Sequence, residues 1–160
     1  MAYTLDDVDK QILNALQENA RYTAIELAEA VGVSDNTIHN RIDRLEEAGI
    51  VTDYTTNTDF RKLGLRLYFH FTCTAAISER ATVAERAMEL SQVLEVTELM
   101  TGQENLHIKA VGGEDRDITH VAEQLDQLPL EINDENLIRA EHTDSLDYVE
   151  LSGLIEGERT

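Results

Sequence analysis

The sequence is poor in the residues that mark several protein classes. Its 160 residues include one cysteine, one proline and no tryptophan, and only 13 are lysine or arginine. The single Cys73 excludes an intramolecular disulfide and a zinc site built from several cysteines. No stretch approaches the roughly 18 consecutive apolar residues of a membrane-spanning helix, and the first residues lack the basic and apolar regions of a signal peptide. We therefore expect a cytoplasmic protein with no membrane partner.

Acidic residues greatly outnumber basic ones. There are 32 Asp and Glu residues, which gives a formal net charge of −19, and they are spread along the chain. Small soluble domains usually carry a net charge of about 2 to 8 in magnitude. Salt screens such self-repulsion, since the Debye length falls to about 3 Å at 1 M. The composition therefore predicts a halophilic protein; an ordinary acidic protein that avoids nucleic acid is the alternative.

Three short helices are predicted in the first third of the chain. Asp6, Thr23 and Ser34 stand at N-cap positions, each ahead of apolar residues at helical spacing. Thr23 also forms a T-x-x-E capping box with Glu26. Gly32 separates the second helix from the third by a turn too short for antiparallel packing. This spacing is typical of a helix-turn-helix, whose second helix enters the major groove of DNA.

The third predicted helix has a polar outward face. Ile38, Ile42 and Leu45 form its buried stripe. Asn can hydrogen-bond adenine, Arg can hydrogen-bond guanine, and the Thr methyl can contact the thymine methyl. Base contacts are expected from Asn36, Thr37, His39, Asn40 and Arg41, and phosphate contacts from Ser34 and Arg44. A merely solvated helix face is the alternative.

The predicted DNA-binding segment is itself acidic. Residues 1–55 hold four basic and eleven acidic residues, a formal charge of −7. In dilute buffer such a segment should bind a duplex poorly, because neutralisation of phosphates dominates affinity. At molar salt the contribution of phosphate neutralisation to affinity is small for every protein. A few arginines would then be sufficient to orient the duplex. The alternative function is a small-molecule-sensing or oligomerising regulator that no longer binds DNA directly.

The pattern changes from helical to alternating after residue 64. Residues 50–64 read as a short strand and a connecting arm. The order that follows is β-α-β-β-α-β, which is typical of a ferredoxin-like sheet. The predicted elements are a strand from Leu65 to Cys73, a helix capped by Ser78, strands at 93–101 and 106–111, a helix ended by Pro129, and a strand within 130–139.

Several segments resemble the leucine-responsive (Lrp/AsnC) family of regulators. They are LDDVDKQIL at 5–13, NARY at 19–22, VGVS at 31–34 and RIDRLEEAGI at 41–50. The resemblance implies a winged or plain helix-turn-helix, a strand-bearing arm, and a βαββαβ domain for effector binding and oligomerisation. It also implies dimers, often octamers, and transcription regulation that in many members responds to amino acids. The acidic composition resembles a haloarchaeal version of the family.

We predict an α+β fold with an N-terminal three-helix (winged) helix-turn-helix domain followed by a ferredoxin-like βαββαβ domain. The expected ranges are 1–52 for the DNA-binding domain, 53–64 for the arm, 65–150 for the effector and oligomerisation domain, and 151–160 for a C-terminal tail. The expected function is sequence-specific binding of double-stranded promoter DNA. P-loop, GxSxG and HExxH motifs are absent from the sequence, so neither an enzymatic activity nor a cofactor is expected.

A turn in the second domain is the candidate effector site. In the family this turn commonly carries a Gly-x-x-Asp motif near a small-molecule pocket; here Gly102 fits and Asn105 replaces the acid. An amide contacts an ammonium group about half as strongly as a carboxylate does. The candidate residues for an amino acid or other small metabolite are Thr101, Gly102, Gln103, Glu104 and Asn105. A tight hairpin without a ligand is the alternative.

Two histidines are expected to face each other across neighbouring strands. Strand alternation places His70 and His107 on the side of the sheet opposite the apolar residues. Two imidazoles can begin a metal site, but the spacing supplies no third ligand. We therefore expect no metal, and a pair that packs or titrates at a subunit interface.

Overall fold

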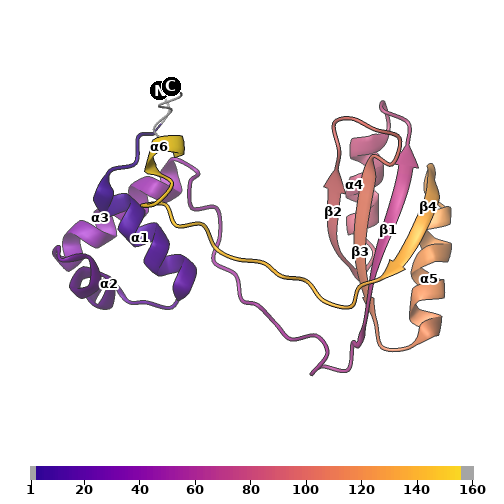
Figure 1. Cartoon of the computed structure of the whole chain (residues 1–160), viewed down its shortest axis with the longest axis horizontal. Coiled ribbons are helices and arrows are strands. Elements are labelled where there is room, and N and C mark those ends of the chain that lie inside the picture. Colours follow the sequence, from indigo (N-terminus) through magenta and orange to yellow (C-terminus); the bar gives the residue numbers. More distant parts are fainter. Residues whose placement is uncertain (1–2, 156–160) are drawn as a thin grey trace. The chain divides into compact units, whose positions relative to one another are not determined.

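A computed structural model describes residues 3–155, and the chain forms two compact units (Figure 1). The helical unit comprises the residues up to Asn57 together with those from Thr143 onward. The sheet unit comprises residues 58–142. The chain therefore enters the sheet unit once, leaves it once, and returns to the helices.

The end of the chain is organised differently from the expected ranges. We expected the second domain to run over 65–150, but residues 143–150 group with the helical unit. The expected tail, 151–160, begins with the short helix α6, Ser152–Ile155. The last five residues of that tail lie outside the described part of the chain.

Three capped helices build the helical unit, as predicted. They are α1 Asp7–Glu18, α2 Ala24–Val31 and α3 Asp35–Glu47. The side chains of Asp6, Thr23 and Ser34 accept hydrogen bonds from backbone N–H groups of the first turns. Those N–H groups have no partner within a helix, so each cap stabilises its helix start. The apolar residues buried between the helices are Ile12, Leu13, Leu27, Ala28, Ile38 and Leu45.

Gly32 gives the turn between α2 and α3 its geometry. Its φ of +81° lies in the left-handed region, which glycine adopts without steric cost. Its N–H donates to the Ala28 carbonyl at 2.8 Å and closes the end of α2. Ser34 starts α3 two residues later, which completes the predicted helix-turn-helix.

The segment after α3 is extended, and the prediction of a strand within 50–64 is wrong. Residues 52–59 belong to no sheet in the described structure, and a turn follows over 60–64. Ile50 and Val51 instead donate their N–H groups to the Leu45 carbonyl, at 2.9 and 3.2 Å. A strand requires a neighbouring strand for its backbone hydrogen bonds, and this segment has none among the described residues of the chain.

Residues 146–148 lie against α1. Asn14 Nδ2 donates to Asp147 Oδ1, and the Tyr148 N–H donates to Asn14 Oδ1, both at 3.0 Å. Gln17 Nε2 donates to the Leu146 carbonyl at 2.9 Å. Tyr148 also packs against the apolar core of the helical unit. Residues 143–155 are therefore part of the helical unit.

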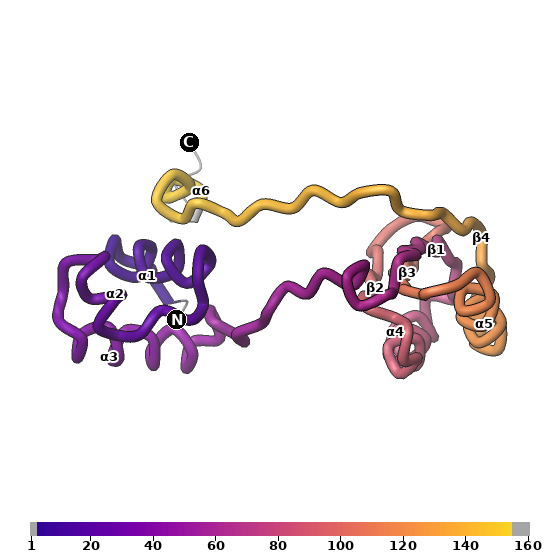
Figure 2. The backbone as a smooth tube through the Cα atoms, turned by 90° about the horizontal axis from the view of Figure 1, so that it is seen from below, coloured from indigo at the N-terminus to yellow at the C-terminus, as the bar shows by residue number. Residues whose placement is uncertain are grey.

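The sheet unit has the predicted βαββαβ order. Its elements are β1 Leu67–Ala75, α4 Arg80–Met88, β2 Val93–Glu98, β3 Leu106–Gly112, α5 Asp115–Asp126 and β4 Leu130–Leu137. The strands lie in the order β2-β3-β1-β4, and every neighbouring pair is antiparallel. Both helices cover the same face of the sheet (Figures 1 and 2). Within residues 3–155, no helix is long and apolar enough to cross a membrane.

The core of the sheet unit lies between the sheet and its two helices. Phe71 and Ile108, from β1 and β3, are fully buried there with Val83 of α4 and Val121 of α5. Cys73 belongs to the same cluster, and its burial raises the pKa of the thiol to about 11. A thiol with so high a pKa stays protonated at neutral pH and is a weak nucleophile.

The start of α4 differs from the prediction. Ser78 was expected to cap this helix, but the N-cap residue is Glu79, whose side chain makes no capping hydrogen bond. The first helical residue, Arg80, reaches the end of β2 instead: its Nε lies 3.2 Å from Glu98 Oε2, and its Nη1 donates to the Leu99 carbonyl at 2.6 Å. A tertiary ion pair therefore fixes the helix start where the sequence suggested a local cap.

Candidate functional site

The start of α3 is fixed by two hydroxyl groups. Ser34 Oγ accepts a hydrogen bond from the Thr37 N–H at 3.2 Å and lies 2.9 Å from Thr37 Oγ1. Ser34 is exposed and Thr37 is half-buried. The N-terminal end of a helix carries partial positive charge and attracts anions. Ser34 therefore stands at an end of the helix that attracts anions, and its phosphate contact stays a prediction.

A polar stripe runs along the outer side of α3. It consists of the exposed residues Asn36, His39, Asn40 and Arg44. The opposite side of the helix buries Ile38 and Leu45 completely. Residues four apart lie one above the other on a helix, so Asn36, Asn40 and Arg44 form a row with His39 beside it. Their donors and acceptors suit base edges and phosphates.

Arg41 lies differently from the other predicted DNA-contacting residues. Its Nη1 donates to Asp6 Oδ2 and, at 3.2 Å, to Asp9 Oδ1. Partial burial by itself would raise the pKa of Asp6, but hydrogen bonds from the Asp9 N–H and from Arg41 outweigh it, and the pKa lies below its usual value. The guanidinium, expected to contact a base, is thus engaged at the N-terminus of α1.

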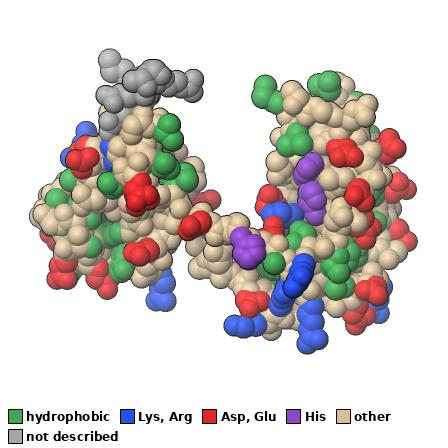
Figure 3. All heavy atoms as spheres, in the orientation of Figure 1, with side chains coloured by type: hydrophobic (Ala, Val, Ile, Leu, Met, Phe, Trp, Pro, Cys, Tyr) green, Lys and Arg blue, Asp and Glu red, His purple; other side chains and the backbone are tan. Residues whose placement is uncertain are grey.

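Few cations are exposed on the helical unit. Lys10 is only 1% exposed, and its Nζ lies 3.8 Å from Asp7 Oδ1. With Arg41 also engaged, Arg21 and Arg44 are the exposed cations among the described residues of this unit. Acidic side chains are spread over the visible surface (Figure 3). The attraction to DNA phosphates is therefore weaker than the four basic residues in the sequence suggest.

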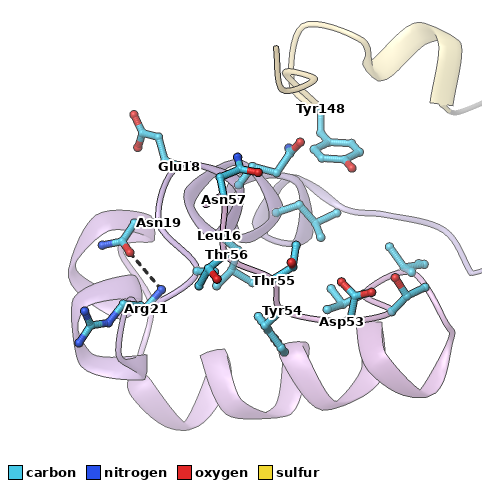
Figure 4. Close-up of a pocket in the computed structure, with 16 residues that line it drawn as sticks. Leu16, Glu18, Asn19, Arg21, Asp53, Tyr54, Thr55, Thr56, Asn57 and Tyr148 are labelled. Carbon is cyan, nitrogen blue, oxygen red and sulfur yellow. Dashed lines mark hydrogen bonds between the residues drawn. The ribbon is translucent and has the colours of Figure 1, made fainter. Parts of the chain in front are cut away.

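A groove lies between the end of α1 and the extended segment after α3 (Figure 4). Its volume is about 550 Å³, and its lining includes Leu16, Ile50 and Tyr148. Arg21 and Asp53 lie at opposite ends of it (Figure 4). Sequence reasoning missed this groove because its walls come from three separate segments. No motif in the sequence could have indicated it.

The predicted effector turn borders a hollow on the sheet unit. The hollow has a volume of about 710 Å³ and is lined by Thr74, Leu99, Thr101, Gly102, Gln103, Glu104, His107, Glu131 and Asn133. Gly102 makes the turn with a φ of +104°. Sequence reasoning missed Thr74, His107, Glu131 and Asn133. The strand order could have indicated them, since β3, β1 and β4 lie side by side.

Asn105, the fifth predicted effector residue, faces the interior. It is 4% exposed; its Oδ1 accepts from the Ala75 N–H and its Nδ2 donates to the Ala75 carbonyl, each at 2.9 Å. This amide continues the β1–β3 pairing beyond its last pair, Cys73 and Leu106. A carboxylate could supply only the acceptor. The fold engages the side chain fully, and it does not line the hollow.

His70 and His107 meet across β1 and β3, as the alternation predicted. Their ring centroids are 4.9 Å apart. Burial, and then the positive charges of His107 and Lys109, lower the pKa of His70. Lys109 Nζ itself contacts Glu95 at 3.2 Å and Glu141 at 2.6 Å. Within residues 3–155, no group of three or more His, Cys, Asp or Glu side chains is arranged to hold a metal ion.

Comparison with known proteins agrees with the geometry of the helical unit. A family model described as "winged helix-turn-helix DNA-binding" matches residues 5–52. The chain is 33% identical over 118 residues to the HTH-type transcriptional regulator AldR of Mycolicibacterium smegmatis, covering 71% of this chain and 69% of that protein. It is 29% identical over 105 residues to the HTH-type transcriptional regulator FL11 of Pyrococcus furiosus, covering 66% and 69%.

Solved structures extend the similarity to both units. A transcriptional regulator from Neisseria meningitidis, crystallised as a complex with L-Met, has a TM-score of 0.79 and 28% identity, over 92% of this chain and 99% of that chain. The leucine response regulatory protein LrpA of Mycobacterium tuberculosis has the same fold, with a TM-score of 0.75 at 20% identity over 88% and 96%. The chain belongs to the Lrp/AsnC family of helix-turn-helix transcriptional regulators.

Proposed function

We propose that this regulator reads specific DNA sequences with α3 lying in the major groove. The observation that carries the proposal is the exposed row of Asn36, Asn40 and Arg44, with His39 beside it, on a capped helix whose other side is buried. Asn side chains can hydrogen-bond adenine in two places. The phosphate contacts are assigned to Ser34, at the anion-attracting N-terminus of α3, and to the exposed cation Arg44. Thr37 adds a methyl group that suits thymine.

Two copies of the chain are proposed to bind together, with the sheet unit as the effector and oligomerisation domain. A two-fold dimer presents its recognition helices one DNA turn apart, or a multiple of it, so the half-sites should be palindromic. Octamers built from such dimers would contact several sites at once. We further propose that the protein has no enzymatic activity of its own and acts in the cytoplasm.

The proposed effector is an amino acid or another small metabolite, bound in the hollow bordered by Thr101–Glu104. Glu104 and Glu131 line this hollow and can accept hydrogen bonds from an ammonium group. Gln103 and Asn133 add neutral donors and acceptors. The similar regulator from Neisseria meningitidis was crystallised with L-Met, which supports an amino acid as the ligand class.

We also assign the protein to a salt-rich cytoplasm, of the haloarchaeal type. The support is the net charge of −19, spread over the whole chain. Such a surface repels itself in dilute buffer, and molar salt screens that repulsion.

Selection from a random duplex library tests the DNA-reading role. The full chain is used in about 2 M KCl, where self-repulsion is screened. The wild type should enrich palindromic sites, and Asn40→Ala should lower the preference at one or two base pairs by about 1–3 kcal/mol. Asn57→Ala, in the same unit but off α3, is the matched control and should leave the preferences unchanged. Enrichment of no sequence by the wild type would refute the proposal.

A regulator that senses or oligomerises without contacting DNA is the second candidate. The charge of −7 on residues 1–55, and the engagement of Lys10 and Arg41 by acids of α1, favour it. Genome-wide chromatin immunoprecipitation of the protein, which measures the DNA sites bound in the cell, separates the two candidates. Enriched promoter sites support the DNA-reading role, and their absence supports the alternative.

A further inference from the structure

Arg41 contacts both carboxylates of the capping box that starts α1. In this box Asp6 Oδ1 accepts from the Asp9 N–H at 3.0 Å, and Asp9 Oδ2 accepts from the Asp6 N–H at 3.1 Å. Arg41 Nη1 donates to the other oxygen of each carboxylate, Asp6 Oδ2 and Asp9 Oδ1. One guanidinium of α3 is therefore bonded to the two acids that define where α1 begins.

Asp9 requires this cation because it is buried. Its side chain is 1% exposed, and Tyr3 also donates its hydroxyl to Asp9 Oδ2 at 3.2 Å. A buried carboxylate is costly unless it is paired and hydrogen-bonded. The two carboxylates also repel each other, and a cation between them removes that repulsion. The Arg41 side chain is itself only 25% exposed. The contact is thus a partly buried ion pair between two helices, which salt screens less than a surface pair.

We infer that Arg41 is a positioning residue, which fixes the recognition helix on α1 through Asp6 and Asp9 and does not read a base. Arg41 Nη1 lies between the two carboxylates, so a movement of the guanidinium toward a guanine edge would draw it away from Asp6 and Asp9 and weaken the pairing of the buried Asp9. The exposed polar residues of α3 are not held by an ion pair of this kind. Base reading then falls to Asn36, Thr37, His39 and Asn40. This inference rests on the proposed DNA-reading function and assigns the part that Arg41 plays in it.

Arg41→Ala is a poor test of this role. It removes the guanidinium that pairs with the buried Asp9, which is expected to destabilise the helical unit strongly, so a loss of DNA binding would be uninformative. Arg41→Lys keeps the positive charge but replaces the planar guanidinium, whose Nη1 contacts both carboxylates, with a compact ammonium on a flexible stem, which changes the geometry of both contacts. Asp6→Asn weakens the same contact from the other side and lies outside α3. The two substitutions and their double combination form a mutant cycle.

The experiment measures the affinity of the full chain for a selected operator duplex and for every single base-pair variant of it. Thermal unfolding first establishes a temperature at which all proteins are folded. Arg41→Lys and Asp6→Asn should each lower operator affinity about tenfold, with the order of preferred bases unchanged at every position. The double variant should bind no more weakly than the weaker single variant, because both remove one contact.

Two further variants calibrate the result. Asn40→Ala should change the base preference at particular positions, which a positioning residue does not do. Arg86→Lys, an exposed arginine of α4, should change neither affinity nor preference. The inference is overturned if Arg41→Lys removes the preference at one base pair, or if the losses of Arg41→Lys and Asp6→Asn add in the double variant.

Failure of the proposed function has a different signature. If the wild type prefers no sequence, the DNA-reading role fails, and the inference fails with it. If the wild type prefers a sequence and Arg41→Lys alters that preference, only the role assigned to Arg41 fails.

Discussion

The side chain of Asn105 donates to the Ala75 carbonyl and accepts from the Ala75 N–H. We predict that Asn105→Asp lowers the free energy of unfolding at neutral pH by about 2–4 kcal/mol, because a buried carbonyl loses its donor and faces a buried carboxylate. Urea unfolding of the full chain measures this loss. The loss should shrink at low pH, where a protonated carboxyl can donate again.

Gln103→Glu provides the matched control for that prediction. It makes the same amide-to-acid change two residues away, at an exposed position of the same turn. Exposed substitutions usually change stability by no more than about 0.5 kcal/mol. Equal losses for the two variants would mean that net charge matters and the contact with Ala75 does not.

His70 gives the sheet unit a predicted sensitivity to pH. Burial and the positive charges of His107 and Lys109 lower its pKa below that of the unfolded chain, while Glu95 and Glu141 oppose the shift. The unfolded state therefore binds the proton more readily, so stability should fall as the pH drops through about 6.5, the unfolded pKa. The loss stops once the pH is below the folded pKa. His70→Gln should reduce this pH dependence, measured by urea unfolding between about pH 8 and pH 5.

The exposed His120 serves as the control for His70. His120→Gln should leave the pH dependence as it is in the wild type. A wild-type protein that becomes more stable as the pH falls from about 7.5 to 6 would contradict the predicted sign.

At the scale of elements, the turn of the helix-turn-helix depends on one backbone conformation. A Cβ placed on Gly32 would meet no atom within 4 Å, so the cost of a side chain there comes from its φ of +81° alone. We predict that Gly32→Ala destabilises the helical unit by about 1 kcal/mol, and that Gly32→Asn costs less, because Asn tolerates the left-handed region. Circular dichroism during thermal unfolding measures both. An Ala variant as stable as the wild type would contradict the prediction.

Local patterns were sufficient to predict most of the elements. The capped starts of α1, α2 and α3 and the alternation in β1 are encoded in residues close together in sequence. The start of α4 was missed because it involves a distant residue. Its first residue, Arg80, pairs with Glu98, which lies 18 positions further along the chain. The prediction of a strand within 50–64 was wrong, because a strand also needs a neighbouring strand to pair with, and the local sequence does not show whether one is present.

In the candidate sites, too, the features set by nearby residues were predicted and those set by distant residues were missed. Helical periodicity placed Asn36, His39, Asn40 and Arg44 on one exposed face of α3. It could not show that Asp6 and Asp9 engage Arg41, because a helical wheel says nothing of the neighbouring helix. Asn105 was misassigned for a similar reason: its partner, Ala75, is 30 residues away on another strand. Spacing thus identifies a face, and packing decides which of its side chains are free to bind.

At the scale of the whole molecule, charge is the dominant property. Among the described residues, several of the basic side chains are paired with acids, including Arg41, Arg80, Lys109 and Arg116. Such pairs remove few of the 32 acidic charges from the surface, and the net charge stays at −19. Repulsion of this kind acts against both compact units and against contact with DNA, and salt is the variable that relieves it.

We therefore predict that the thermal unfolding midpoint rises as KCl increases from about 0.1 M to about 2 M, over which the Debye length shrinks from about 10 Å to below 3 Å. A triple variant, Glu85→Gln, Glu89→Gln and Glu123→Gln, removes three exposed charges of the sheet unit, one on α4, one at its C-cap and one on α5. It should raise the midpoint at low salt and leave it nearly unchanged at high salt, since only unscreened repulsion is relieved. A midpoint that is flat or falls with KCl would show that packing alone sets the stability, and that the acidic surface is no adaptation to salt.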